Sequence, residues 1–394
     1  MNKLFTGIFV SALLALPGLV FGADVNKTAA KQPTAQEKAL WDKITSGNQE
    51  LDKFQREKIP KPPAGPDVNE AAIKKYEKEF EAFKKDFLKQ VIPLFDDTKE
   101  YYNKYPKGSF AGENMRLLFI LLTNVTFLSD GILAPADEQL YERLCKDENL
   151  TADTAGELFW VNLIRVSRLM DTPKDNNEPD KKAVEALLDK IQIQINDFGR
   201  RFKSQGFLLQ GEVKLADAVE KLFPRRSIQI LTDAKKYASE EVAKRLDGLI
   251  RNKSVLGTRP EIKFKAVDGN EVDLSKLKGK VVLIDFWATW CPPCIEELPK
   301  VIDTYKKYHS KGFEIIGISF DKDIEAVKKF VKEKGMTWPQ YSDGKFWDND
   351  WGVYFGIQQI PTMWLVDKDG KVVDAELQGS ELEAKVAKLL GVEK

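Results

Sequence analysis

The sequence predicts two folds in one chain, an all-helical N-terminal region followed by an α/β domain with a mixed central sheet. Between residues 37 and 253, apolar side chains recur every three or four positions, and no convincing alternating strand appears. After Gly257, strand-like runs alternate with helical ones and finish in a hairpin, which is typical of an α/β domain. A length of 394 residues also suits two domains.

The N-terminus has the pattern of a secretory signal peptide, which we assign to residues 1–22. Lys3 gives a positive start, Leu4 to Val20 are mostly apolar, and Val20-Phe21-Gly22 offers small residues for cleavage. An uncleaved membrane anchor is the alternative, because the apolar stretch approaches the length of a membrane span. We therefore expect export across the inner membrane and a periplasmic location, which is an oxidising compartment.

The helical region is expected to consist of two parts. Residues 23–66 should form a polar start, a short helix and a proline-rich linker, and residues 67–256 an all-helical domain of unassigned role. The clearest helical pattern follows the capping candidates Asp67 and Asn69, and Pro93 should kink or end that helix.

Further helices are expected along the rest of this region. Met115–Leu128 is apolar nearly all round but too short to span a bilayer, so it predicts a central buried helix. The other helical patterns cover Glu138–Leu144, Leu158–Leu169, Val184–Phe202 and Ile228–Leu249. Breaks are expected at Pro173–Pro179, Gly206, Gly211 and Pro224.

The α/β domain is expected to span residues 257–394. Predicted strands are Glu261–Val267, the apolar run Val281–Ile284, Phe313–Phe320, and a terminal hairpin of Thr362–Val366 with Lys371–Leu377. Predicted helices are Ile295–Tyr308, Ile324–Lys334 and Ser380–Leu390.

Composition narrows the chemistry. Lysine plus arginine and aspartate plus glutamate both total 61, so the formal net charge is zero. There is therefore no basic excess that would indicate a nucleic-acid partner. The only histidine is His309, which leaves histidine-based metal sites, a Ser-His-Asp triad and a Cys-His dyad poorly supported. We therefore expect chemistry from cysteine or carboxylate side chains, with no metal and no cofactor beyond a redox-active disulfide.

Two of the three cysteines, Cys291 and Cys294, follow the apolar strand and open the next helix. A helix N-terminus stabilises a thiolate, which suits thiol–disulfide exchange. Cys291 would be the exposed attacking thiol, and Cys294, more buried in the helix, would resolve the mixed disulfide. The alternatives are a zinc site, which would need a second pair or added histidines, and a static disulfide in a four-residue loop, which would constrain the unfolded chain little.

The motif Phe286-Trp287-Ala288-Thr289-Trp290-Cys291-Pro292-Pro293-Cys294 resembles that of thioredoxin, and most of all the exported TlpA/ResA-like branch of the superfamily. Gly279 to Leu283 before it and Ile360-Pro361-Thr362 before the terminal hairpin fit the same pattern. The resemblance covers the chain from about Gly257 onward and implies a thioredoxin-like fold there.

The resemblance also implies roles for individual residues. Cys291 attacks and Cys294 resolves, while Asp285 matches a buried acid that accepts the proton Cys294 must lose. A partly exposed strand-end aspartate is the alternative for Asp285. Pro361 matches a cis-proline, and the preceding Ile360 pairs with the bound peptide through its backbone.

Four more residues complete the predicted site. Trp290 would cover the disulfide, and Pro292 would lie in the substrate-binding wall and, with the next proline, tune the reduction potential. Glu297 matches an acidic position of the branch, although an ordinary helix-surface residue fits nearly as well. Pro299 would kink the active-site helix.

The function expected from these residues is reduction of selected protein disulfides by an exported oxidoreductase. Its partners would be disulfide-bonded client proteins and an electron donor, for which a membrane thiol reductase is one candidate. The main alternative is an envelope interaction or scaffold protein whose helical domain binds a partner. A peroxiredoxin is disfavoured, because Ala288 and Ile284 occupy positions where its Thr/Ser and Pro would lie.

Three further features are expected to be structural. His309 should lie near a helix end, and the aromatic residues between Trp338 and Phe355 should mainly pack in the core, with a substrate groove as the alternative. Cys145 should be a buried thiol, with an electron-relay or intermolecular role as the alternative.

Overall fold

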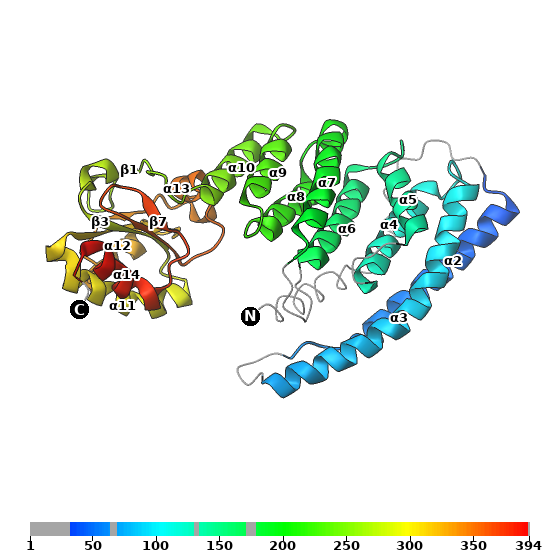
Figure 1. Cartoon of the computed structure of the whole chain (residues 1–394), viewed down its shortest axis with the longest axis horizontal. Helices are drawn as coiled ribbons and strands as arrows, with labels where there is room; N and C mark the ends of the chain where they lie inside the picture. The colour runs from blue at the N-terminus through cyan, green and yellow to red at the C-terminus, as the bar shows by residue number, and fades with distance from the viewer. Residues whose placement is uncertain (1–31, 64–68, 130–133, 171–178, 393–394) are drawn as a thin grey trace. The chain divides into compact units, whose positions relative to one another are not determined.

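The computed structural model describes residues 32–63, 69–129, 134–170 and 179–392 (Figure 1). The predicted signal at residues 1–22 and the capping candidate Asp67 lie outside these ranges. The chain forms two compact units, one made of Met1–Gln194 with Gly206–Gly211 and the other of Ile195–Gln205 with Glu212–Lys394.

Helices form the whole of the first unit's described secondary structure. They are α2 (Ala35–Lys58), α3 (Glu70–Lys104), α4 (Ala111–Leu128), α5 (Pro135–Cys145), α6 (Ala152–Met170), the first part of α7 (Lys181–Phe202) and the first part of α8 (Gly206–Val219). Within the described part of the chain, no helix is both long and apolar enough to cross a membrane.

The longest helix, α3, shows where the sequence pattern was right and where it was wrong. Asn69 caps its N-terminus, because its side-chain oxygen accepts a bond of 3.0 Å from the backbone N–H of Ala72. Pro93 does not end the helix, which continues to Lys104. The apolar face runs through the proline, with Val91 and Leu94 both buried, so packing outweighs the lost backbone hydrogen bond.

Two predicted boundaries after α7 were also wrong. Gly211 does not break the chain but lies inside α8 (Gly206–Val219), where a Cβ would come within 2.9 Å of the Phe159 ring. The pattern Ile228–Leu249 is not one helix but two, α9 (Pro224–Lys235) and α10 (Glu240–Lys253). Ser239 starts α10 by accepting a bond from the N–H of Val242.

The C-terminal part of the second unit is built on a five-stranded mixed sheet of order β5-β4-β3-β6-β7. The strands are β3 (Val281–Trp287), β4 (Phe313–Ser319), β5 (Gln340–Tyr341), β6 (Thr362–Val366) and β7 (Val372–Asp374). β3 is parallel to β4 and antiparallel to β6. A separate hairpin joins β1 (Lys263–Lys265) to β2 (Glu271–Asp273).

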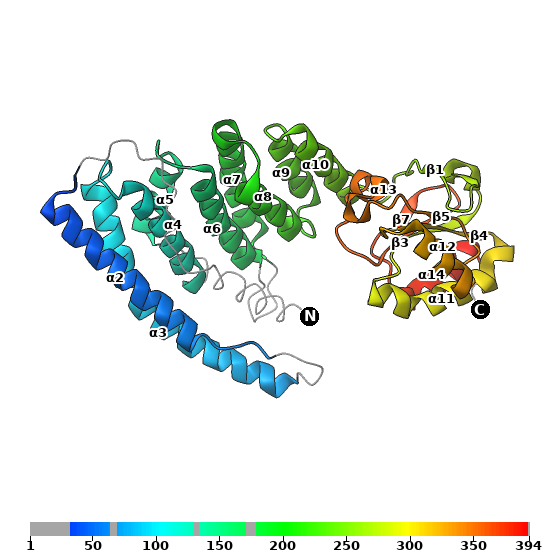
Figure 2. The same ribbon diagram turned by 180° about the vertical axis from the view of Figure 1, so that it is seen from behind.

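Four α-helices accompany this sheet: α11 (Pro292–Tyr308), α12 (Ile324–Lys334), α13 (Asp350–Tyr354) and α14 (Gly379–Leu390). α11 packs against α14, and both views place the two helices on the same side of the sheet (Figures 1 and 2). The predicted all-helical region followed by an α/β domain with a mixed sheet is therefore confirmed.

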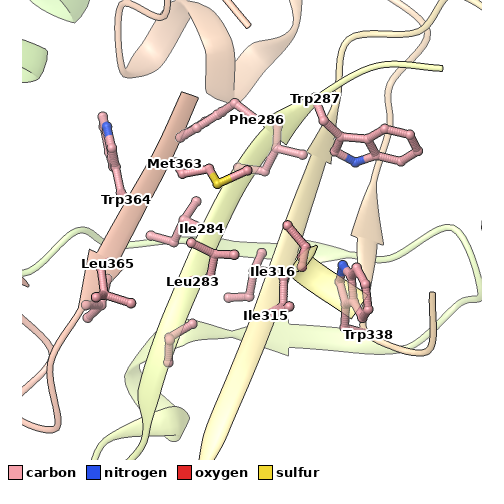
Figure 3. Close-up of a cluster of buried hydrophobic side chains, with 14 of the residues drawn as sticks. Leu283, Ile284, Phe286, Trp287, Ile315, Ile316, Trp338, Met363, Trp364 and Leu365 are labelled. Carbon is pink, nitrogen blue, oxygen red and sulfur yellow. The ribbon is translucent and has the colours of Figure 1, made fainter. Parts of the chain in front are cut away.

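The centre of the sheet fixes the position of the cysteine pair. All seven residues of β3 are buried, as expected for a strand flanked on both sides by other strands. Figure 3 shows Leu283 and Ile284 of β3 beside Ile315 and Ile316 of β4 and Leu365 of β6. This packed strand leads directly into the loop that carries the cysteines.

Candidate functional site

The cysteine pair lies where β3 passes into α11. Cys291 is the N-cap residue of α11, and its sulfur accepts a hydrogen bond of 3.3 Å from the backbone N–H of Cys294. Pro292 occupies the first helical position, where a missing N–H has no consequence for the helix, and its side chain is exposed. Pro292 and Pro293 have no N–H, so the N–H of Cys294 and the positive dipole end of α11 are what face the Cys291 sulfur, and both favour its thiolate.

In this structure the pair is oxidised to a disulfide with 2.12 Å between the sulfurs and 5.3 Å between the Cα atoms. The expectation that Cys291 is exposed and Cys294 more buried is wrong for this state. Cys291 is 3% exposed and Cys294 7%, and both belong to the buried cluster that includes the side chains of β3. An attacking role for Cys291 would therefore depend on its N-cap position rather than on greater exposure.

Asp285 is a buried carboxyl group in the middle of the sheet. It is 4% exposed and pairs in register with Gly317 of β4 and Met363 of β6. Its Oδ1 has no hydrogen-bond partner among the described residues. Burial, and secondarily the negative charge of Glu297, raises the pKa of Asp285 to about 7. The side chain is therefore poised to exchange a proton near neutral pH, and the alternative of a partly exposed aspartate is wrong.

Glu297 and Pro299 lie further along α11. Glu297 is partly buried, and its Oε1 accepts a hydrogen bond of 3.3 Å from the N–H of Gly379, at the start of α14. Glu297 thus links two helices while its charge acts on Asp285. Pro299 is exposed, and α11 continues through it to Tyr308.

Trp290 is the exposed aromatic residue of the site. Its side chain is anchored by a hydrogen bond of 3.2 Å from Nε1 to the carbonyl of Phe320, yet the residue remains 43% exposed. The ring packs against Phe346 and Trp347, with centroid distances of 5.0 and 6.2 Å. Part of the aromatic-rich segment therefore builds the rim of the site, while Trp338 is core, at 3% exposure.

Asp321 is a site residue that the sequence analysis missed. This buried carboxylate accepts hydrogen bonds from the backbone N–H of Thr289 at 3.0 Å, from the Thr289 hydroxyl, and from Ser319 at 2.8 Å. It therefore ties the loop before Cys291 to the end of β4. The sequence signal for Asp321 was only its position directly after a predicted strand. Its partner Thr289 lies 32 residues away in the chain, so no local pattern indicates their contact.

The second wall of the predicted site is the segment before β6. The peptide bond between Ile360 and Pro361 is cis, and both side chains are partly buried. Because Thr362 at the start of β6 pairs with Phe286 near the end of β3, this bond lies near the end of the strand that leads into the cysteine loop.

Two other residues that the sequence singled out, His309 and Cys145, lie outside this cluster. The Nδ1 of His309 lies 3.2 Å from the carbonyl oxygen of Phe313, and its ring packs against that of Tyr305 in a tilted arrangement. Cys145 is buried in α5, with the amide of Gln194 3.2 Å from its sulfur. Among the residues that the structure describes, no group of three or more His, Cys, Asp or Glu side chains forms a metal site.

Comparison with known proteins gives the same picture for the C-terminal third. The redoxin family model matches residues 257–391. Thiol-disulfide oxidoreductase ResA of Bacillus thuringiensis (strain Al Hakam) is 41% identical over 115 residues, which are 29% of this chain and 65% of that protein. The chain thus spans slightly less than two thirds of that relative's length.

A second relative and a solved structure extend the comparison. ResA of Bacillus thuringiensis subsp. konkukian (strain 97-27) is 35% identical over 133 residues, which are 33% of this chain and 73% of that protein. The crystal structure of the thioredoxin domain of a thiol-disulfide oxidoreductase from Bacteroides vulgatus is 37% identical and covers 34% of this chain and 97% of that chain, with a TM-score of 0.32. Through residues 257–391, which form a thiol-disulfide oxidoreductase domain with a redox cysteine pair, the chain belongs to the redoxin family and is a ResA-like member of it.

Proposed function

We propose that the chain is an exported oxidoreductase that reduces selected protein disulfides through Cys291 and Cys294. The observation that carries this proposal is the disulfide at the N-terminus of α11, next in sequence to the strand that holds the buried Asp285. A helix N-terminus lowers the pKa of a thiol, and a carboxyl group that titrates near neutral pH is suited to proton transfer.

The reaction starts from the dithiol. The Cys291 thiolate attacks one sulfur of the client disulfide, the client S–S bond breaks, and the departing client thiolate takes a proton from solvent. Asp285 then accepts the proton of Cys294, whose sulfur attacks Cys291 Sγ and displaces the second client thiolate. This thiolate takes up a proton from solvent, and Asp285 returns its own proton to solvent. The client has gained two electrons and two protons, and the protein holds the Cys291–Cys294 disulfide. A thiol donor must reduce this disulfide before the next cycle.

Substitution of the attacking cysteine tests the reaction. Cys291→Ser should abolish reduction of insulin disulfides by the prereduced protein, because a serine hydroxyl does not form the mixed disulfide. Cys145→Ser is the matched control and should keep the wild-type rate, because Cys145 is buried in the other unit. An inactive wild type, or an active Cys291→Ser variant, would contradict the proposal.

Export is the second part of the proposal and is supported by the signal-like residues 1–22. N-terminal sequencing of the protein from a cell envelope fraction should give a mature chain that starts near Ala23. A chain that retains Met1 in the membrane would instead support the uncleaved anchor.

A further inference from the structure

Helix α10 lies outside the region matched by the redoxin family, yet it contacts the segment that forms one side of the redox site. Both views place α10 beside α13, and the two helices are in contact (Figures 1 and 2). Asn252 donates a hydrogen bond of 3.0 Å from Nδ2 to the carbonyl of Phe355. Arg251 donates to the carbonyl of Tyr354 and places its guanidinium 3.8 Å from the centre of the Tyr354 ring. These side chains satisfy carbonyls at the end of α13 that have no helical partner.

The backbones of the two segments also touch. A Cβ added to Gly248 of α10 would lie 2.2 Å from the carbonyl oxygen of Val353 and 2.9 Å from the N–H nitrogen of Gly356. In return, a Cβ on Gly356 would lie 2.4 Å from the carbonyl carbon of Gly248. Helix α10 therefore docks at a distance that only glycine allows on either side.

A third contact reaches the other end of the same segment. Arg245 forms an ion pair of 2.7 Å with Asp348, at the end of the short 3-10 helix η3 (Phe346–Asp348). Both side chains are more than half exposed, so this pair contributes less than the contacts at the end of α13. Together these contacts hold residues 346–356 at both ends.

The held segment is the one that carries the rim of the redox site. Phe346 and Trp347 pack on Trp290, which directly precedes Cys291, and the chain continues from Gly356 to the cis bond at Pro361. Phe346 has a φ of 57°, a left-handed conformation that costs energy for a bulky side chain. Such a residue keeps its conformation only where its surroundings hold it.

We propose that α10 is a positioning element of the redox site, and that Gly248, Arg251 and Asn252 are its positioning residues. By holding residues 346–356, α10 keeps the Phe346–Trp347 rim against Trp290 and the Ile360–Pro361 wall in place for a protein client. The inference rests on the proposed function, and it gives α10, which lies outside the redoxin match, a direct effect on client reduction.

The test compares two substrates of different size in the full-length, prereduced protein. Insulin must bind along the rim and the wall, whereas oxidised glutathione is small enough to react with Cys291 while making few contacts with the rim or the wall. Gly248→Ala should lower the ratio of kcat/KM for insulin to that for oxidised glutathione at least fivefold, mainly through a higher KM for insulin. Alanine is a better helix former than glycine. If α10 only had to be helical, and did not have to dock closely on residues 346–356, Gly248→Ala would therefore leave the kcat/KM ratio unchanged.

A double variant, its conservative counterpart and two matched controls complete the design. Arg251→Ala combined with Asn252→Asp removes the donors to the Tyr354 and Phe355 carbonyls without adding volume, and it should lower the insulin-to-glutathione ratio of kcat/KM similarly. Arg251→Lys keeps a donor and a positive charge, so it should restore part of this ratio. Gly112→Ala, at a helical glycine with open space around it, and Arg259→Ala, which removes a bond to the carbonyl of Asp369, should keep the wild-type ratio.

The outcomes separate this inference from the proposed function. A wild type that reduces neither substrate overturns the function itself. A ratio within twofold of wild type in both α10 variants, or equal losses for both substrates, overturns the inference alone. If Gly248→Ala does not fold by circular dichroism, the ratio for the Arg251→Ala, Asn252→Asp variant decides.

Discussion

At the scale of single residues, the buried carboxyl group of Asp285 is the group of the site whose protonation changes near neutral pH. Its pKa is about 7 in the folded protein, against an ordinary value of 3.8. Because the folded-state pKa is raised, the folded state binds the proton more tightly than the unfolded state does. The contribution of this group to stability is therefore most favourable below about pH 4 and is lost as the pH rises towards 7.

This difference predicts that Asp285→Asn stabilises the oxidised protein at high pH. Asparagine stays neutral, so the variant avoids an ionisation penalty that amounts to ~4 kcal/mol above pH 7. The gain in free energy of unfolding, measured by urea denaturation, should be small at pH 4 and rise to its maximum by pH 8. Asp303→Asn, an exposed substitution on α11, is the control. Stability curves for wild type and Asp285→Asn that stay parallel with pH would contradict the prediction.

The same substitution should slow the reaction. The proposed second step needs Asp285 as the carboxylate, so the single-turnover rate of client release should rise with pH through about 7 in the wild type. In Asp285→Asn the rise near pH 7 should disappear, and the rate at pH 8 should fall by about 100-fold, the scale of general base catalysis. Persistence of the wild-type pH profile in the variant would exclude Asp285 as the proton acceptor.

At the scale of elements, the site depends on how the end of β4 holds the loop between β3 and α11. Thr289→Val removes the hydroxyl that donates to the buried Asp321 carboxylate, and a hydrogen bond to a charged group contributes ~1.5–3 kcal/mol. We expect a loss of ~2 kcal/mol in the free energy of unfolding from urea denaturation, together with slower insulin reduction. Thr289→Ser keeps the hydroxyl and should behave nearly as wild type, and equal losses in both variants would contradict this role.

The parts of the site that the sequence predicted are those encoded by neighbouring residues. The apolar run of β3 and the cysteine at the N-cap of α11 are local patterns, so their positions followed directly from the sequence. The role of Asp321 did not, because it acts on Thr289 across 32 residues. The contacts of α10 with residues near Tyr354 span 103 residues, and no periodic pattern records such a pairing.

The break predicted at Gly211 was wrong, and the helix end considered at Pro93 did not occur, for a related physical reason. Pro93 and Gly211 weaken a helix locally, and the sequence pattern therefore placed a kink or end at the proline and a break at the glycine. In the structure α3 continues because its buried face extends past Pro93, and Gly211 remains helical because it lets α8 approach Phe159. Packing partners distant in sequence decide such positions.

At the scale of the whole molecule, the chain could capture partners in two ways, through a mixed disulfide at Cys291 or through contacts with its helical region. Cys294→Ala should leave the mixed disulfide between Cys291 and its client unresolved, because no second thiol attacks it. Partners purified from a cell envelope with this variant should therefore be released by dithiothreitol. A variant with both cysteines changed to serine, the matched control, should capture none of them. If the double variant retained the same partners, the chain would be an interaction protein that binds through its helical region, with the redox domain secondary.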